Sequence, residues 1–544
     1  MADSATPEPF NTGSPQYIRP TKRQARDIND IEGQLQDKLE EQPAYIALYL
    51  ELIQHYNSKD QLENVRQVFD KAHDQFPYFS PLWTMQLNYE LERDEFAKVE
   101  AILAKALAGA TENNDLSLWK TYLDYVRRKN NLITGGEDAR RVVLKAFDVV
   151  AEKCGSLEPR SFTFWNEYLS FLEHWKPVSK WEEQQRIDLL RKLYKQMLVL
   201  PMDNLEKLWN RYTVWEQDVN SLTARKFIGE LSASYMKARS IYQEWSNVTK
   251  GLKRSLPTKL TQVGPSNTNS MPQPGQYDIH QLDIWLKWVK WELDNKLDLA
   301  PDALQARIDY VYKQAIQYMV FAPEVWYNYA MHNQPKSFCI ISTGLLANPS
   351  SPSLTFKLAE HHELNNDVNE VKRCFEDCIN RLILEYHITK DDYPKNDETT
   401  RASQLYHHRQ KLTFVYCIYM NSMKRLSGLS AARKVFRKCR KLEKLLSHEI
   451  YIENAYLEFH NNSDIKTACK VLELGLKYFS NDGEYVNKYL DFLILVNQDA
   501  QIKSLFETSL EKLTDLDQLQ SIYKKVINYE SKFGNLNNVY SLET

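Results

Sequence analysis

Residues 285–292 read Trp-Leu-Lys-Trp-Val-Lys-Trp-Glu and contain the pattern on which the whole chain is built. The three tryptophans stand three residues apart, and Glu292 follows the third one directly. On a helix with about 3.6 residues per turn, positions i, i+3 and i+6 lie along one side, whereas Lys287 and Lys290 point elsewhere. The stretch therefore predicts a helix with one aromatic face.

The same pattern recurs along the chain. An aromatic residue is followed by others three and six positions later, often with a glutamate after the last, and then by a second helical pattern. The copies begin at Tyr45, Trp83, Trp119, Trp165, Trp209, Trp285, Trp326, Phe356, Tyr416, Tyr451, Val486 and Tyr523. Most successive starts are 35 to 46 residues apart. This period, with two helices in each unit, is typical of an α-solenoid. We predict an all-α fold of about twelve TPR-like helix pairs in two lobes.

The recurrent tryptophans have two interpretations. A cluster of indole rings can form a cage for methylated lysine or a platform for stacked bases. Recurrence at the same helical phase in one unit after another instead favours side chains that fill the seam between paired helices. We predict that this repeat core contains Trp83, Trp119, Trp165, Trp209, Trp215, Trp285, Trp288, Trp291 and Trp326.

Two unusually long spacings suggest insertions. After Trp209 an apolar stripe predicts one helix over about 223–254, roughly 45 Å long at about 1.5 Å per residue. A stretch rich in Pro, Gly, Ser and Asn follows and reads as a linker. A second insertion, at about 388–403, contains Asp-Asp-Tyr-Pro-Lys-Asn-Asp-Glu and is predicted to be a mobile acidic loop.

These observations predict the following domain organisation: a disordered N-terminal arm at 1–26, a first lobe of about five repeats at 27–254, a linker at 255–277, and a second lobe of about seven repeats at 278–544. The last repeat begins its second helix after Gly534, and the sequence stops soon afterwards. Because a solenoid avoids an uncapped terminal repeat, we expect that a C-terminal segment has been removed.

Composition excludes several classes of protein. The net charge is −3 and the pI about 6.5, so the chain as a whole is not a basic nucleic-acid binder. The seven cysteines are an odd number and lie inside helical patterns, which fits a reducing compartment better than a disulfide framework. No apolar run is long enough for a membrane helix, so no membrane partner is expected.

The common catalytic, phosphate-binding and metal-binding motifs are absent, which predicts no enzyme, no cofactor and no metal site. The nearest approach to a metal site is Cys374 with Cys378, together with His361 and His362 in the preceding pattern. Thiolate and imidazole could bind zinc. The simpler interpretation is that both cysteines pack as small apolar residues.

A basic segment is the most distinctive charge feature. We predict a candidate interaction surface on one helix, formed by Arg433, Lys434, Arg437, Lys438, Arg440, Lys441 and Lys444. Phosphates of RNA or an acidic partner would be attracted to it. A solvated outer helix face is the simpler interpretation.

The repeat resembles the HAT repeat, or half-a-TPR. The similarity lies in the aromatic spacing, the glutamate, and an Ala-Arg pair in the second helix, as at Ala306-Arg307 and Ala432-Arg433. Segments at 118–128, 207–216 and 235–254 narrow the resemblance to one family of HAT-repeat proteins. So do those at 471–479 and 529–543. They resemble the family of HAT scaffold subunits of yeast pre-mRNA cleavage factor IA, whose metazoan counterpart is the large HAT subunit of cleavage stimulation factor.

This resemblance implies a non-enzymatic scaffold for pre-mRNA cleavage and polyadenylation, working in the nucleus, with the cytoplasm as a second compartment. It implies a homodimer through the C-terminal lobe. It also implies an RRM-bearing RNA-binding subunit held by a segment beyond the repeats, and contacts with other cleavage and polyadenylation factors. Contact with RNA would then be mostly indirect. Two alternatives stay open: a HAT scaffold of splicing or ribosome biogenesis, and direct RNA binding through the basic helix.

Overall fold

The computed structural model describes residues 30–41, 45–108, 114–254, 278–392, 398–462 and 464–543. The predicted arm at 1–26 and the predicted linker at 255–277 lie outside these residues. No strand occurs in the described ranges, and no helix there is both long and apolar enough to cross a membrane. The described residues form two compact units, which we call the first unit (30–348) and the second unit (349–543).

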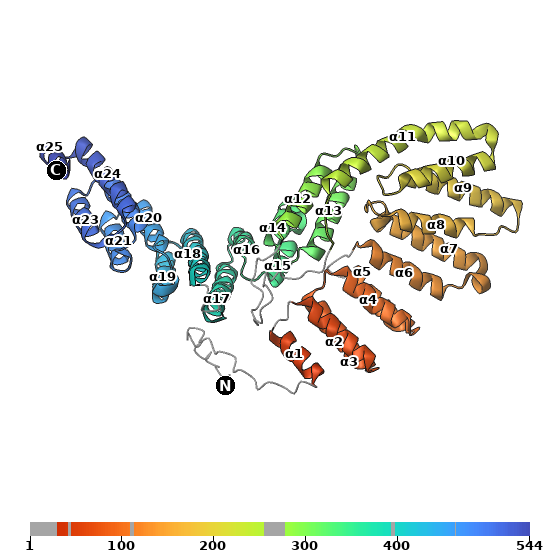
Figure 1. Ribbon diagram of the computed structural model, residues 1–544, viewed down its shortest axis with the longest axis horizontal. Helices are drawn as coiled ribbons and strands as arrows, with labels where there is room; N and C mark the ends of the chain where they lie inside the picture. The colour runs from red at the N-terminus through yellow and green to blue at the C-terminus, as the bar shows by residue number, and fades with distance from the viewer. Residues whose placement is uncertain are drawn as a thin grey trace, which may run out of the picture. The chain divides into compact units, whose positions relative to one another are not determined.

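The first unit consists of helix pairs stacked side by side, shown from red to green in Figure 1. Its helices are α1 (Ile31–Glu41), α2 (Ile46–Ser58), α3 (Leu62–Gln75), α4 (Ser80–Leu91), α5 (Phe96–Ala108), α6 (Leu116–Lys129), α7 (Leu132–Val150), η1 (Ala151–Gly155), α8 (Phe162–Glu173), α9 (Lys180–Met197), α10 (Leu205–Val219), α11 (Ser221–Val248), α12 (Ile279–Leu293), α13 (Pro301–Tyr318), α14 (Pro323–His332), η2 (Gln334–Lys336) and α15 (Ser337–Ala347).

The second unit continues the same architecture. Its helices are α16 (Pro352–Leu364), α17 (Val368–Asp392), α18 (Glu398–Ser427), α19 (Leu429–Cys439), η3 (Arg440–Leu445), α20 (Glu449–Asn462), α21 (Ile465–Phe479), α22 (Gly483–Leu495), α23 (Asp499–Lys512), α24 (Leu516–Phe533) and α25 (Leu536–Glu543).

The α-helices after α1 pair consecutively, α2 with α3 and so on to α24 with α25, which makes twelve pairs. Every start of the sequence pattern lies in, or directly before, the first helix of one pair, from Tyr45 before α2 to Tyr523 in α24. The predicted all-α solenoid of helix pairs is confirmed.

The two predicted insertions differ from the structure in extent. Helix α11 ends at Val248, six residues before the predicted end at 254. The predicted acidic loop at 388–403 is mostly helical, because α17 continues to Asp392 and α18 already begins at Glu398. The pattern of Pro and acidic residues therefore did not show that both flanking helices extend into this segment. The long spacing before Tyr416 therefore comes from two extended helices.

Burial separates the nine predicted core tryptophans into two groups. Trp83, Trp119, Trp165, Trp285, Trp288, Trp291 and Trp326 are buried, each at most 8% exposed. Trp209 and Trp215 are half-buried and pack against the edge of the core. The ring of Trp209 stacks on Tyr235 with 4.4 Å between ring centroids.

In three repeats the first tryptophan also has a polar role. The indole Nε1–H of Trp83 donates to the carbonyl of Pro77 at 2.9 Å, and that of Trp326 donates to Val320 at 2.9 Å. Trp165 donates in the same way to Gly155 at 3.2 Å. Each acceptor lies just before the helix that carries the tryptophan. In these repeats the ring packs between the paired helices, and its N–H donates a hydrogen bond to the segment that precedes its own helix. A phenylalanine has no N–H and could not make this bond.

The boundary between the two compact units does not coincide with the predicted linker. It falls between Asn348 and Pro349, so the sixth and seventh helix pairs belong to the first unit. Rings join these pairs to the start of the unit: Phe79 meets Tyr318 at 6.2 Å, and Tyr78 meets Trp326 at 5.3 Å.

A buried carboxylate strengthens this closure of the first unit. Glu158, which is 4% exposed, accepts hydrogen bonds from the Arg254 guanidinium at 3.0 and 3.1 Å and from the hydroxyl of Tyr310. Arg307 on α13 donates to the carbonyl of Ser156 at 3.4 Å. The chain on either side of 255–277 is thereby held against the connection between η1 and α8.

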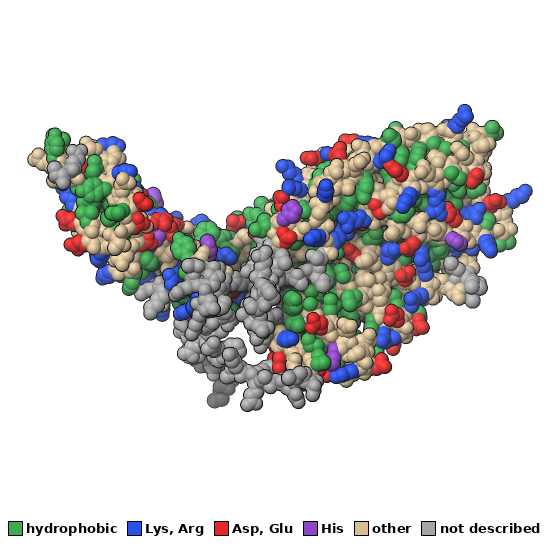
Figure 2. All heavy atoms as spheres, viewed as in Figure 1, with side chains coloured by type: hydrophobic (Ala, Val, Ile, Leu, Met, Phe, Trp, Pro, Cys, Tyr) green, Lys and Arg blue, Asp and Glu red, His purple; other side chains and the backbone are tan. Residues whose placement is uncertain are grey.

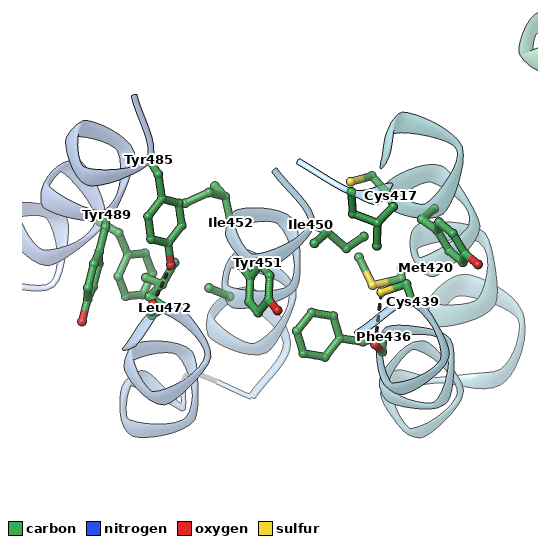
Figure 3. Close-up of a cluster of buried hydrophobic side chains, with 14 of the residues drawn as sticks. Cys417, Met420, Phe436, Cys439, Ile450, Tyr451, Ile452, Leu472, Tyr485 and Tyr489 are labelled. Atoms are coloured by element: carbon green, nitrogen blue, oxygen red, sulfur yellow. Dashed lines mark hydrogen bonds between the residues drawn. The ribbon is translucent and has the colours of Figure 1, made fainter. Parts of the chain in front are cut away.

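The core of the second unit has the same construction. Figure 3 shows Phe436 and Tyr451 facing each other between α19 and α20, with Tyr485 donating its hydroxyl hydrogen to the carbonyl of Leu472. Gly475 lies directly against Tyr485 and Tyr451, where an added Cβ would collide with both rings. The missing side chain lets α21 approach α20 and α22 closely.

We predict that Trp165→Ala lowers the free energy of unfolding by about 3–5 kcal/mol, because the 2%-exposed ring leaves a cavity. Trp209→Ala should cost less, since the ring is only half-buried. Lys287→Ala is the control: its side chain is 58% exposed and pairs only with Asp283 on the same helix. Thermal and urea unfolding of the three variants measure the effect. Equal midpoints for Trp165→Ala and Lys287→Ala would contradict the core assignment.

Candidate interaction surface

The glutamates of the repeated pattern lie buried in joints between consecutive helix pairs. Glu90 at the end of α4 is 1% exposed and accepts two hydrogen bonds of 2.8 Å from Arg66 on α3. Glu216 on α10 does the same with Arg191 on α9, at 2.7 and 3.3 Å. In each joint the arginine comes from the second helix of the preceding pair.

The same joint recurs in the second unit. Glu458 on α20 accepts from Arg433 on α19 at 2.7 and 2.6 Å. Glu530 on α24 pairs with Lys503 on α23 at 3.7 Å. The hydrogen bonds with Glu458 raise the pKa of Arg433 above its ordinary value. The glutamate of the pattern is therefore an acceptor that the previous repeat satisfies.

Glu292 is instead satisfied within its own helix pair. Glu292, at the end of the helix 285–292, accepts from Arg307 of the following helix α13 at 2.9 and 3.0 Å. It also accepts from the indole of Trp288 at 3.1 Å. Both charged side chains are at most 6% exposed. The arginine of the Ala-Arg pair in the second helix is thus the donor in both contacts: Arg307 donates to Glu292, and Arg433 donates to Glu458.

The predicted basic surface is divided by these contacts. Helix α19 ends at Cys439, and the segment after it, η3, contains a kink at Leu442, so the seven residues do not lie on one helix as predicted. Arg433 is held by Glu458, and Lys438 pairs with Glu376 at 2.7 Å. A stripe of basic residues in a sequence does not show which of them an acidic neighbour already neutralises.

Three residues of the predicted surface stay available. Lys434, Arg437 and Lys441 are exposed, and no described carboxylate pairs with them. Arg440 is half-buried, and the side chain of Lys444 lies outside the described part. On the face of the molecule in Figure 2, basic and acidic side chains are interspersed over the described helices. The candidate surface is thus a small local patch.

The cysteine and histidine residues considered for zinc are not brought together. Cys378 is buried and Cys374 half-buried, and burial raises the pKa of each thiol to about 11. Among the described residues, neither cysteine belongs to a group of three ligands close enough to share a metal ion. Both cysteines lie on α17, where Cys378 packs in the core of the second unit and Cys374 is half-buried.

One cluster of titratable side chains was not identified from the sequence. His448 and Glu449 at the start of α20 meet Asp482 and Glu484 at the start of α22, where Lys488 also reaches them. Burial lowers the pKa of His448, but its hydrogen bond with Asp482 and its close approach to the carboxylate of Glu449 outweigh this and raise the pKa to about 9. About 34 residues separate the two groups, so no short motif contains them. Their equivalent position in consecutive repeats is the signal that could have revealed them.

With this architecture established, comparison with known proteins gives the family. Residues 30–544 match the family model described as Suppressor of forked protein (Suf). The chain belongs to the Suf family.

Relatives of this Suf-family chain support the assignment over its whole length. It is 58% identical to the mRNA 3′-end-processing protein RNA14 of Saccharomyces cerevisiae, over 100% of this chain and 80% of that protein. It is 59% identical to the protein of the same name from Eremothecium gossypii, over 98% of this chain and 80% of that protein. The crystal structure of CSTF-77 superimposes with a TM-score of 0.55 at 15% identity, covering 85% of this chain and 87% of the other. This structural similarity supports the HAT-type helical fold, and the family expected from the sequence is confirmed.

We predict that Arg66→Met destabilises the first unit by about 3 kcal/mol, because it leaves Glu90 buried without its partner. Arg141→Met is the matched control, since Arg141 is 66% exposed and pairs with its near neighbour Asp138. The double variant Arg66→Met with Glu90→Met should recover most of the stability. Urea unfolding of the four proteins measures these differences. An Arg66→Met protein as stable as Arg141→Met would show that the joint contributes little.

Proposed function

We propose that this protein is a non-enzymatic, homodimeric scaffold of the machinery that cleaves and polyadenylates pre-mRNA 3′ ends. The observation that carries the proposal is the identity of 58–59% over nearly the whole chain with relatives named mRNA 3′-end-processing protein RNA14. Membership of the Suf family supports a role in the same process, and we infer that the protein works in the nucleus, where pre-mRNA is processed.

The arrangement of charged groups supports a scaffold. The buried carboxylates of Glu90, Glu216, Glu292 and Glu458 are each matched by an arginine that joins two helices. Three of these ion pairs join consecutive repeats, and the one of Glu292 joins the two helices of a single repeat. A stack of helix pairs presents long surfaces to several partners at once. Partners are then recognised by side chains on the outer faces of the helices.

Exposed apolar side chains support a dimer through the C-terminal repeats. On α18, Tyr406 is 55% exposed and Phe414 54% exposed, and Leu384 on α17 is 37% exposed. A contiguous apolar patch on a protein surface marks an interface with another chain, and we place the proposed dimer contact at these side chains. The proposed partners also include the RRM-bearing subunit that the resemblance implies, bound by a segment after the repeats, and other cleavage factors.

We predict that the whole chain forms a dimer of twice 64.0 kDa, and that the isolated second unit also dimerises. The isolated first unit should be a monomer. Multi-angle light scattering over a dilution series measures all three masses.

Phe414→Arg should shift the dimer towards monomer, because it places a charge in the proposed interface. Leu222→Arg is the control, since Leu222 is 91% exposed in the first unit. Monomers of the whole chain and of the second unit at every concentration would refute the homodimer. A dimer that both substitutions leave equally intact would move the interface away from α18.

Direct contact with RNA is a second proposal, favoured by one observation. Lys434, Arg437 and Lys441 form an exposed group of cations without described acidic partners. Such a group attracts phosphates without reading bases, so its contribution would be independent of sequence and sensitive to salt.

The triple variant Lys434→Glu, Arg437→Glu, Lys441→Glu tests this second proposal. We expect weaker binding to single-stranded RNA and a shallower dependence of log K on log salt, by roughly 0.7 for each phosphate that the variant no longer neutralises. Arg433 is left unchanged because it holds Glu458. A control variant reverses Lys192, Lys195 and Lys226, which are exposed in the first unit. Fluorescence anisotropy at several salt concentrations gives the slopes. Equal slopes for wild type and the triple variant would exclude this patch.

A further inference from the structure

The joint between the tenth and eleventh helix pairs carries the group of side chains introduced above. Helix α20 begins at Glu449, directly after His448, and Asp482 caps α22 through the backbone N–H groups of Glu484 and Tyr485 at 3.1 and 3.4 Å. The starts of the two helices are therefore adjacent. This places one imidazole and three carboxylates at one joint.

The imidazole of His448 is oriented for binding an ion. The side chain is 4% exposed, and its Nδ1 hydrogen-bonds with Oδ2 of Asp482 at 2.7 Å. Its Nε2 is buried and has no hydrogen-bond partner, the nearest carboxylate oxygen being Oε1 of Glu449 at 3.4 Å. A carboxylate that holds one ring nitrogen so that the other can bind a metal is a recurrent arrangement in zinc proteins.

Two carboxylates share the space in front of Nε2. A ring nitrogen of His448 and one oxygen each of Glu449 and Glu484 lie within 4.8 Å of one another. The Lys488 ammonium contacts Glu449 and lies 3.0 Å from Glu484. The structure thus places the Lys488 ammonium, next to the imidazole of His448, where the two carboxylates converge.

We propose that this joint binds one Zn²⁺ ion through Nε2 of His448 and the carboxylates of Glu449 and Glu484. Asp482 orients the imidazole, and water completes a tetrahedral site. The ion takes the place of the Lys488 ammonium, which turns into solvent, and of the proton on His448, which is released. An imidazole among carboxylates suits Zn²⁺, whereas Mg²⁺ and Ca²⁺ favour oxygen ligands alone.

The geometry requires only a local adjustment. Bonds of about 2.0–2.2 Å to zinc bring tetrahedral ligand atoms to roughly 3.3–3.6 Å from one another, so the 4.8 Å group must contract. Glu484 is 58% exposed and its side chain is free to move inward, while His448 is fixed by burial. Since its ligands come from two consecutive repeats, the ion would fasten α20 to α22.

Competition between Zn²⁺ and a fluorescent chelator, on the whole chain, tests this proposal. We expect one Zn²⁺ to bind per chain, at least tenfold more weakly in His448→Gln. Asp482→Asn keeps the helix cap but should weaken binding about 10–100-fold, as removal of an orienting carboxylate does. Lys488→Met should bind Zn²⁺ at least tenfold more tightly, because the competing ammonium is gone. His174→Gln is the control, being an exposed histidine of the first unit.

Lys488→Met keeps the test decisive if His448→Gln disturbs folding, because it predicts a gain in affinity. Bound Co²⁺ should also give the intense visible absorption of a tetrahedral site in wild type and not in His448→Gln. Failure of both wild type and Lys488→Met to compete for Zn²⁺ would overturn the proposal. Binding that His448→Gln leaves unchanged would overturn it too, since the ion would then lie elsewhere. Affinity in Lys488→Met no higher than in wild type would equally refute the site.

Discussion

A buried carboxylate at the end of a first helix is the interaction on which the stacking of this solenoid depends. An ionised glutamate that loses its water costs several kcal/mol unless another group supplies a charge and hydrogen bonds. At Glu90, Glu216 and Glu458 the partner is an arginine of the preceding pair. Each pair thus presents a polar group that only a correctly placed neighbour can satisfy. Apolar and aromatic packing supplies most of the stabilisation, and the ion pair prevents the buried carboxylate from opposing it.

The helix that contributes the arginine changes where the sixth and seventh pairs pack against the early repeats. Glu292 takes Arg307 from its own pair, and the sixth and seventh pairs turn back towards the connections of the early repeats. Glu158 serves as the common acceptor there for Arg254 and Tyr310. Ordinary solenoid repeats contact only their neighbours. The first unit departs from this rule, which explains why seven helix pairs form one compact body.

The same joints limit which surfaces are left for partners. Arg433 and Lys438 look like binding residues in the sequence, yet Glu458 and Glu376 already hold them. The surface that stays open in the described residues includes a small group of cations on α19 and η3 and several exposed apolar side chains on α17 and α18. A scaffold of this kind recognises its partners with residues that the repeat does not require.

The sequence by itself determined the repeat. Aromatic residues at i, i+3 and i+6 allow only a helix to bury them on one face, so the fold class, the order of the pairs and most of the core tryptophans followed from spacing alone. The family followed from the same residues. Local periodicity also placed α11, because a long apolar stripe specifies a long helix.

Only the tertiary structure decided which distant residues meet. The division between the two units falls after Asn348. The closure through Glu158 and the cluster at His448 join segments that lie roughly 34 to 150 residues apart in the sequence. The burial of Trp209 and the pairing of Arg433 likewise depend on neighbouring helices. The physical reason is that periodicity reports which face of one helix is apolar, whereas pairing depends on the angle and separation of two helices. The sequence of a basic or proline-rich segment is the same whether that segment lies in solvent or packs against another part of the fold.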